Sequence, residues 1–448
     1  MIIKSFNKIL IANRGEIAVR IMKTAKKLGI SSVAIYSEVD LESYHVRFAD
    51  EAFCIGEQEL NDTYLNVDKI ISVALKSGCD AIHPGYGFLS ESPILVDACN
   101  KAGITFIGPD IEAITLMGNK IEARNFVRKT GVPMTEGITG DTEHLLKNAN
   151  KIKYPILVKA AAGGGGKGMR IVNDPKMLRE ILETTSREAL NYFGDGTIYI
   201  EKYIEEPRHI EFQVIGDNYG NVIHLFEREC TIQRRYQKII EEAPSPTLTP
   251  EVRNKMGKSA VDIAKGVGYN SVGTIEFLVD NDLNYYFLEM NTRIQVEHPV
   301  TELVTGIDLV EEQIYIAAGN KLRLKQEEVK QSGNAIESRI YAEDPANNFL
   351  PHPGLISLLL FPEGKNIRID SSIDRVTTIH SFFDPMISKL IVWEKTRDKA
   401  IELSIKSLKE FVIHGIKTNI TFLINVLEHP TFRENKLSTK FCDEHIDD

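Results

Sequence analysis

The residues with the clearest capacity for chemistry lie in a stretch that reads as a β-hairpin. Four turn-forming residues separate two strand-like runs, TIEFLVD and YYFLEMN, which predicts a four-residue hairpin loop. A symmetric loop pairs Asp280 with Tyr285, and counting back along both strands places Glu276 directly opposite Glu289. Side chains opposed in this way have Cβ atoms about 4.5–5.5 Å apart, so two carboxylates repel unless a cation compensates them.

A Lys or Arg side chain could be that cation, but two carboxylates and the nearby amide of Asn291 suit Mg²⁺ or Mn²⁺, hard ions that take oxygen ligands. Strand alternation points Glu289, Asn291 and Arg293 the same way, and Gln295 and Glu297 follow if the extended conformation continues. This face offers metal ligands, an anion-binding guanidinium and a further carboxylate. An exposed polar strand face is the alternative, and it explains all five residues poorly.

A second candidate is the glycine tract at 163–168, GGGGKG. A phosphate-binding P-loop would need Gly where the chain has Ala161, and Ser or Thr where it has Gly168. The tract lies between two strand-like runs, PILVKA and MRIV, so a glycine-rich hairpin flap fits better. Glycine lets backbone N–H groups approach phosphate oxygens, and Lys159 and Lys167 add positive charge. A flexible surface loop is the alternative.

Other polar clusters are ambiguous by themselves. Glu201, Lys202 and Tyr203 lie where the chain leaves a strand, TIYIEKYI, and His209 follows on the next strand. A lone His is usually structural. The basic run at 233–238 is either a solvated face or a local pocket for a small anion.

The elements that must position these residues fall into three predicted regions. Residues 1–115 alternate short apolar strands with helical patterns, which predicts a doubly wound α/β unit with a parallel, Rossmann-like sheet. Its first turn lacks the G-x-G-x-x-G fingerprint, so this shape does not imply a dinucleotide. Residues 116–330 read as α+β, with the flap at about 132–203, and residues 331–446 read as a smaller α+β unit with two helical patterns.

Composition limits the possible functions. The chain has 448 residues, 43% hydrophobic and 26% charged, with five scattered cysteines and no C-x-x-C pair, which argues against a disulfide scaffold or a structural zinc site. The formal net charge of −10 argues against nonspecific attraction to nucleic acid or anionic lipid. No apolar run reaches a membrane span, and the expected compartment is the cytoplasm.

The sequence resembles the biotin carboxylase branch of the ATP-grasp ligases over nearly its whole length. The stretches that carry the resemblance are IANRGEIAVRI from Ile11, HPGYGFLSE from His83, GGGGKGMR from Gly163, EKYIEEPRHIEFQV from Glu201, RRYQK from Arg234, EMNTRIQVEHPVTE from Glu289 and GIKTN from Gly415. The EDP at Glu343 and FLPHPG at Phe349, beside Arg339, resemble the C-terminal domain of this branch. The resemblance implies an ATP-dependent ligase that carboxylates biotin with bicarbonate through carboxyphosphate.

The resemblance also implies roles for individual residues. The ATP-binding set would be Lys120, Lys159, Gly165, Gly166, Glu201, Lys202, Tyr203, Ile204, His209, Gln233, Tyr236, Glu276 and Glu289. Two metal ions, Mg²⁺ or Mn²⁺, would be held by Glu276, Glu289 and Asn291, and bicarbonate by Lys238, Arg293, Gln295 and Val296. Glu297 would be the general base, and Arg339 would stabilise the enolate-like form of biotin.

Three positions depart from the usual pattern of the family. Ala162 replaces a flap glycine, Asn119 replaces an acidic residue, and Tyr236 stands where a His is usual. We expect the first two to alter flap mobility or a contact behind the site. Tyr236 puts a nucleotide hydrogen bond in doubt, although a phenol still donates and accepts.

The expected partners follow from the same resemblance. The sequence contains no MKM biotinyl-lysine motif, so biotin is expected on a separate carrier protein, with carboxyltransferase subunits and a homodimeric carboxylase. A subunit of bacterial acetyl-CoA carboxylase, serving fatty acid biosynthesis, is the first expectation. A subunit of a pyruvate or 2-oxoglutarate carboxylase would look much the same. Another ATP-grasp carbon–nitrogen ligase, or a nucleotide-binding regulatory subunit without catalysis, are the remaining alternatives.

Overall fold

A parallel five-stranded sheet forms the N-terminal part of the computed structural model, which describes residues 5–162 and 168–446. The strand order is β3-β2-β1-β4-β5, with every pair parallel, as the alternation of strands and helices predicts. The strands are β1 (Lys8–Ile11), β2 (Ser31–Tyr36), β3 (Glu51–Cys54), β4 (Ala81–His83) and β5 (Thr105–Phe106). The helices of this part are α1 (Gly15–Lys27), α2 (Tyr44–Phe48), α3 (Val67–Ser77) and α4 (Pro93–Ala102).

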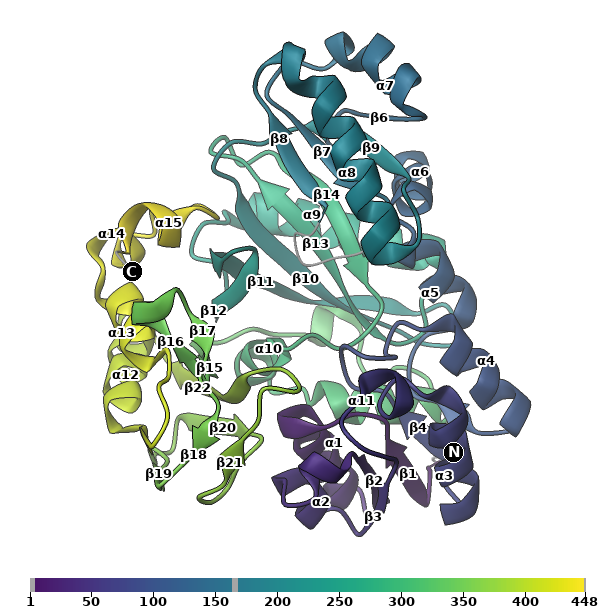
Figure 1. The fold of residues 1–448 in the computed structure, drawn as a ribbon, viewed down its shortest axis with the longest axis vertical. Helices are drawn as coiled ribbons and strands as arrows, with labels where there is room; N and C mark the ends of the chain where they lie inside the picture. The colour runs from purple at the N-terminus through teal and green to yellow at the C-terminus, as the bar shows by residue number, and fades with distance from the viewer. Residues whose placement is uncertain (1–4, 163–167, 447–448) are drawn as a thin grey trace.

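An eight-stranded antiparallel sheet runs through the centre of the molecule (Figure 1). Its order is β14-β13-β10-β11-β12-β15-β22-β20. The strands are β10 (Arg208–Gly216), β11 (Val222–Arg234), β12 (Gln237–Ala243), β13 (Val272–Val279), β14 (Tyr285–Asn291), β15 (Asn334–Tyr341), β20 (Ile367–Ser371) and β22 (Met386–Glu394). Because β12 pairs directly with β15, the sheet continues across residue 331, where the sequence suggests the start of a third region.

A smaller four-stranded sheet, of order β6-β9-β7-β8, forms the flap at the top of Figure 1. Its strands are β6 (Gly137–Thr139), β7 (Ile156–Ala160), β8 (Met169–Val172) and β9 (Ile198–Lys202), and it is accompanied by α7 (Thr142–Asn148) and α8 (Leu178–Phe193). Strands β7 and β8 pair antiparallel, with Lys159 opposite Met169. The predicted glycine-rich hairpin is therefore confirmed on both flanks, while Gly165 and Gly166 lie outside the described residues.

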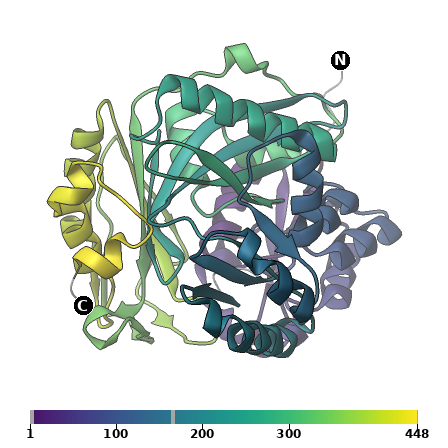
Figure 2. The same ribbon diagram turned by 90° about the horizontal axis from the view of Figure 1, so that it is seen from above.

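Helices cover the faces of the central sheet. Helix α12 packs on β15 and β22 on one side, and Figure 2 shows the C-terminal helices along that side, while α10 packs on the other. The remaining helices are α5 (Ile111–Gly118), α6 (Lys120–Thr130), α9 (Pro250–Val267), α10 (His298–Thr305), α11 (Leu309–Ala317), α12 (Arg397–Glu410), α13 (Ile420–Glu428), α14 (Pro430–Arg433) and α15 (Phe441–His445). The short C-terminal strands are β16 (Glu343–Asp344), β17 (Leu350–Pro351), β18 (Gly354–Leu355), β19 (Leu358–Leu360), β21 (Thr378–Ile379) and β23 (Val412–His414). Among the described residues, no helix combines the length and apolarity that crossing a membrane requires.

The β13–β14 hairpin confirms one predicted pairing and corrects another. Glu276 lies opposite Glu289, as predicted, but Tyr285 pairs with Val279 and not with Asp280. The side chain of Asp280 instead accepts hydrogen bonds from two backbone N–H groups within the loop, so this residue belongs to the turn. A register shift beyond Phe277 adds one residue to β14 and restores the opposition of the two glutamates.

A buried ion pair stabilises the N-terminal part and leads to a prediction about acid stability. Arg14 donates two hydrogen bonds to Asp40, at 2.7 and 2.6 Å, and the hydroxyl of Tyr64 donates a third, at 2.5 Å. Burial raises the pKa of Asp40, but Arg14 and Tyr64 outweigh it and lower that pKa to about 2. A carboxyl with a lowered pKa stabilises the fold above its ordinary pKa of 3.8, and this contribution is lost as the pH falls towards 2.

We expect Asp40→Asn to lower the free energy of unfolding by about 2 kcal/mol at pH 7, and by less at pH 3. Urea unfolding of the parent and the variant at both pH values measures this difference. The prediction fails if the parent and the variant differ in their free energy of unfolding by the same amount at pH 3 and at pH 7.

Candidate active site

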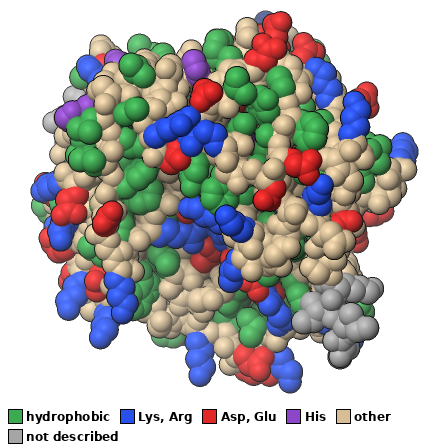
Figure 3. Space-filling view, turned by 90° about the horizontal axis from the view of Figure 1, so that it is seen from below, with side chains coloured by type: hydrophobic (Ala, Val, Ile, Leu, Met, Phe, Trp, Pro, Cys, Tyr) green, Lys and Arg blue, Asp and Glu red, His purple; other side chains and the backbone are tan. Residues whose placement is uncertain are grey.

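A cavity of about 780 Å³ opens between the N-terminal sheet, the flap and the central sheet. It gathers most of the residues selected from the sequence, although they are spread from Lys120 to Arg339. Those that line it are Lys120, Lys159, Glu201, Lys202, Tyr203, Ile204, His209, Gln233, Tyr236, Lys238, Glu276, Glu289, Asn291, Arg293, Gln295, Val296 and Arg339. On the face drawn in Figure 3, Lys and Arg side chains gather near the centre, so a net charge of −10 for the whole chain does not exclude a local basic site.

Lys238 is the electrostatic centre of the site. Its Nζ lies 2.6 Å from Glu211 Oε2, 2.9 Å from Glu276 Oε1 and 2.7 Å from Glu297 Oε1. Burial lowers the pKa of this amine, but the three carboxylates outweigh burial and raise the pKa well above its ordinary value. Lys238 is therefore a permanent cation, and the basic run that contains it enters a pocket and is not wholly a solvated face.

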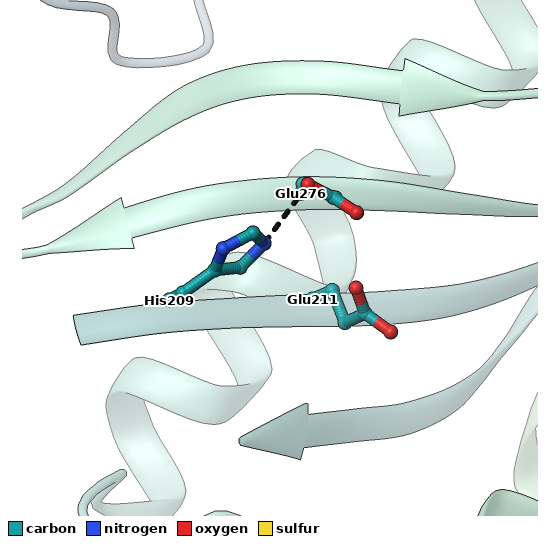
Figure 4. Close-up of side chains that lie close together, drawn as sticks. All are labelled: His209, Glu211 and Glu276. Atoms are coloured by element: carbon teal, nitrogen blue, oxygen red, sulfur yellow. Dashed lines mark ion pairs between the residues drawn. The ribbon is translucent and has the colours of Figure 1, made fainter. Parts of the chain in front are cut away.

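Figure 4 shows the ring of His209 on β10 pointing towards Glu276 on β13, and Glu211 lies on the same strand as His209, paired with Glu276 in the sheet register. His209 Nε2 lies 2.9 Å from Glu276 Oε2, and its Nδ1 lies 2.9 Å from the side-chain amide nitrogen of Gln233. Potential ligand atoms of the three residues in Figure 4 lie within 4.8 Å of one another. However, Glu211 is already bound by Lys238 and by Arg228, whose Nε donates to it at 2.5 Å. We therefore interpret these three residues as a cluster whose charges are compensated by the protein itself.

Glu276 and Glu289, which lie opposite each other on the hairpin, provide oxygen ligands that suit a divalent cation. Glu276 is compensated by Lys238, and it also accepts hydrogen bonds at 3.0 Å from the side-chain amides of Asn291 and Gln295. Burial and the charge of Glu276 raise the pKa of Glu289, as expected for two carboxyls that lie close together. Two carboxylates and the amide oxygen of Asn291 on one hairpin are suitable ligands for Mg²⁺ or Mn²⁺.

The chain beyond β14 departs from the predicted extended form but brings the expected side chains to the cavity. Strand β14 ends at Asn291, and Glu297 lies in a turn, with φ −82° and ψ 11°, at the start of α10. Arg293 donates to Asn291 Oδ1 and Gln295 Oε1, each at 3.1 Å, and its Nε donates to Glu91 at 2.9 Å. These contacts hold a guanidinium beside the donor set of the hairpin.

Glu297 lies behind the cavity wall and has no exposed surface. One carboxylate oxygen accepts from Lys238, and the other accepts from Arg339 Nη2 at 2.9 Å. Burial raises the pKa of Glu297, but Lys238 and Arg339 outweigh burial and hold the pKa well below its ordinary value. Arg339 is held in turn by Glu241, to which its Nε donates at 2.6 Å.

The flap side of the cavity presents a second set of cations. Lys159 Nζ lies 3.0 Å from Glu201 Oε1, and the other oxygen of Glu201 accepts from Arg124 at 2.8 Å and Thr135 at 2.7 Å. The carboxylate of Glu201 is thus occupied in positioning Lys159. Burial lowers the pKa of Lys120, the second cation facing this part of the cavity.

Two of the three departures from the family pattern have a structural setting. Asn119 is the N-cap of α6, where its side chain accepts from the backbone N–H groups of Ile121 and Glu122, a role that an aspartate also performs. Tyr236 lies at the β11–β12 turn with φ +65° and a 58% exposed side chain. Nothing in the structure explains Ala162.

Sequence reasoning assigned no role to Glu211 or Arg228, both of which have no exposed surface and support the site from behind. The available signal was strand alternation, because Glu211 lies two residues after His209 on the same strand. It also assigned no role to Glu91, which holds Arg293. Glu91 follows β4, and the carboxyl ends of neighbouring parallel strands are a common position for site residues.

Comparison with known proteins agrees with this geometry. The family descriptions that match are "Biotin carboxylase, N-terminal domain" over residues 5–114, "Carbamoyl-phosphate synthase L chain, ATP binding domain" over 119–325 and "Biotin carboxylase C-terminal domain" over 337–444. Biotin carboxylase 1 of Bacillus subtilis is 52% identical over 442 residues, which cover 98% of each chain. One of the pyruvate carboxylase subunits of Methanothermobacter thermautotrophicus is 50% identical and aligns over 98% of this chain and 90% of its own.

Solved structures give the same result. The biotin carboxylase domain dimer of Hydrogenobacter thermophilus 2-oxoglutarate carboxylase, solved with MgADP, ADP and bicarbonate, superposes with a TM-score of 0.96 at 48% identity and covers 99% of this chain and 98% of its own. A biotin carboxylase from Campylobacter jejuni, in complex with an ATP ligand, also gives 0.96, at 45% identity with 98% and 99% covered. The chain therefore belongs to the biotin carboxylase family.

Proposed function

We propose that this chain carboxylates biotin on a carrier protein, using ATP and bicarbonate and releasing ADP and phosphate. The observation that supports it most directly is the buried carboxylate of Glu297, which lies between Lys238 and Arg339 directly behind the wall of the cavity. The two opposed glutamates of the β13–β14 hairpin line the same cavity. The transfer of a phosphoryl group to bicarbonate requires three things: a base, cations that bind the anions, and ligands for a metal ion. This cavity and the residues behind its wall offer all three.

In this proposal the flap and the strands around it bind ATP. The residues concerned are Lys120, Lys159, Gly165, Gly166, Glu201, Lys202, Tyr203, Ile204, His209, Gln233 and Tyr236. Glu276, Glu289 and Asn291 would hold Mg²⁺ or Mn²⁺, which when bound neutralises charge on the phosphate oxygens. Lys238, Arg293, Gln295 and Val296 bind bicarbonate beside that phosphate.

The chemistry then proceeds in two stages. Glu297 removes the proton of bicarbonate, and the freed oxygen forms a bond to the γ-phosphorus while the bond to ADP breaks, giving carboxyphosphate. Carboxyphosphate releases CO₂ and phosphate, phosphate takes the proton from the ring nitrogen of biotin, and that nitrogen bonds to CO₂. Arg339 stabilises the negative charge that develops on the ureido oxygen of biotin.

The proposed assembly is a homodimer that works with a biotin carboxyl carrier protein and carboxyltransferase subunits. A bacterial acetyl-CoA carboxylase is the first choice for the complete enzyme. Relatives among pyruvate and 2-oxoglutarate carboxylases at 48–50% identity support these as the second candidate. Co-purification of the chain from its source, with partner subunits identified by mass, distinguishes the two.

The proposed activity predicts ATP hydrolysis that requires bicarbonate and is stimulated by free biotin. ADP release measured with bicarbonate alone, with biotin alone and with both tests this result. Robust ATP turnover without bicarbonate, in the presence of an amine, would instead identify a carbon–nitrogen ligase. Binding of ATP without turnover under any of these conditions would identify a regulatory subunit.

A further inference from the structure

A lysine outside the predicted set holds the backbone next to the proposed base. Lys389 lies on β22, in register with Arg339 on β15 and Asp370 on β20, and has no exposed surface. A buried ammonium is strongly unfavourable unless it is paired and hydrogen-bonded. The partners of the Lys389 ammonium group therefore indicate its role in the structure.

The Nζ of Lys389 has two close partners from different parts of the chain. It donates a hydrogen bond of 2.7 Å to the carbonyl oxygen of Val296, and it lies 3.2 Å from Glu16 Oε1 in the first turn of α1. Burial lowers the pKa of this amine, but Glu16, Glu337 and Asp370 outweigh burial and raise it. Lys389 is thus a cation directed at one peptide group.

That peptide group joins Val296 to Glu297. Gln295 and Val296 line the cavity, and Glu297 is the N-cap of α10. The preceding carbonyl is also held, because the Nδ1 of buried His298 lies 2.8 Å from the carbonyl oxygen of Gln295. Two buried side chains therefore fix consecutive carbonyls of the turn that carries the base and two proposed bicarbonate ligands.

We propose that Lys389 is a positioning residue for the bicarbonate step, acting through the Val296 carbonyl to fix the turn from Gln295 to Glu297. The inference rests on the proposed function. Lys389 comes from β22 and its counter-ion from α1, whereas none of the residues proposed above to contact the nucleotide belongs to β22 or α1. Its loss therefore affects bicarbonate and the base, with little effect on ATP.

The test removes the lysine together with the charge of its ion-pair partner, Glu16. Lys389→Met alone would leave Glu16 buried and anionic, so the informative variant is Glu16→Gln/Lys389→Met, compared with Glu16→Gln, which retains the lysine donor. Steady-state turnover is measured at varied bicarbonate and at varied ATP. Relative to the Glu16→Gln background, the double variant should raise the KM for bicarbonate about tenfold or more and lower kcat, with the KM for ATP nearly unchanged.

A matched control is Glu227→Gln/Arg253→Met, which removes another ion pair with a buried carboxylate, outside the cavity. It should lose stability without changing either KM, as expected of a purely structural ion pair. The proposal is overturned if the Lys389 double variant folds and shows an unchanged KM for bicarbonate, or if the KM values for ATP and bicarbonate rise equally. Failure of the proposed function is separate, because the parent protein would then lack bicarbonate-dependent turnover altogether.

Discussion

Replacing Glu297 with glutamine should abolish biotin-dependent turnover while ATP still binds. General-base catalysis by a positioned side chain typically contributes about 10²- to 10⁴-fold, and the amide has no basic oxygen to accept the proton of bicarbonate. The substitution conserves volume at a site with no exposed surface, and the amide can still accept from Arg339. Bicarbonate-dependent ADP release measures the loss, and calorimetric titration with ATP measures binding.

The electrostatics of Glu297 suggest how it becomes a competent base. With Lys238 and Arg339 on its two oxygens, its pKa lies well below the ordinary value, which makes the resting carboxylate a weak base. An incoming bicarbonate competes for Lys238, and we expect the pKa of Glu297 to rise as that cation turns towards the substrate. In the proposed mechanism, Glu297 thus becomes a stronger base when the bicarbonate whose proton it removes is bound.

A suitable control is Glu227→Gln, because Glu227 is also buried and ion-paired but lies outside the cavity. This control should keep biotin-dependent turnover near the parent rate. Turnover of Glu297→Gln within tenfold of the parent would exclude Glu297 as the base.

Replacing the opposed glutamates should change the requirement for Mg²⁺. Glu289→Gln removes a metal donor, and we expect the Mg²⁺ concentration at half-maximal rate to rise about tenfold or more, with a lower maximal rate. Glu276→Gln should have the larger effect, because Glu276 also binds Lys238 and accepts from Asn291 and Gln295. Turnover measured against Mg²⁺ at fixed ATP gives both quantities.

Asp280→Asn provides the control on the same hairpin, since Asp280 serves the loop and the asparagine can still accept from the loop backbone. Its Mg²⁺ curve should match that of the parent. If both glutamate variants keep the parent curve, the hairpin does not hold the metal.

The sequence was most informative where the chemistry depends on local spacing. The opposition of Glu276 and Glu289 was predicted by counting back along both strands from a symmetric loop. It survived an error in the loop register because the irregularity beyond Phe277 shifts the pairing by one residue. The extended path assumed for residues 293–297 was wrong. The turn before α10 nevertheless brings Glu297 to the site, since Lys238 and Arg339 draw its carboxylate inward.

Contacts between distant strands could not be predicted in the same way. Lys238 joins β12 to β10, to β13 and to the start of α10, and no local pattern encodes these pairings. Arg228 and Glu211 have no exposed surface, whereas charged residues in a sequence are by default read as solvated. Buried charges of this kind become visible only when the fold shows which opposite charge each one faces.

The pairing of β12 with β15 has a consequence for modularity. A fragment that stopped at residue 330 would expose the part of β12 that pairs with β15, residues 240–243, as an open strand edge of the kind that aggregates. It would also leave Glu241 without Arg339. The paired strands thus join residues on both sides of position 331 into one sheet, and recombination between relatives would have to exchange β12 and β15 together.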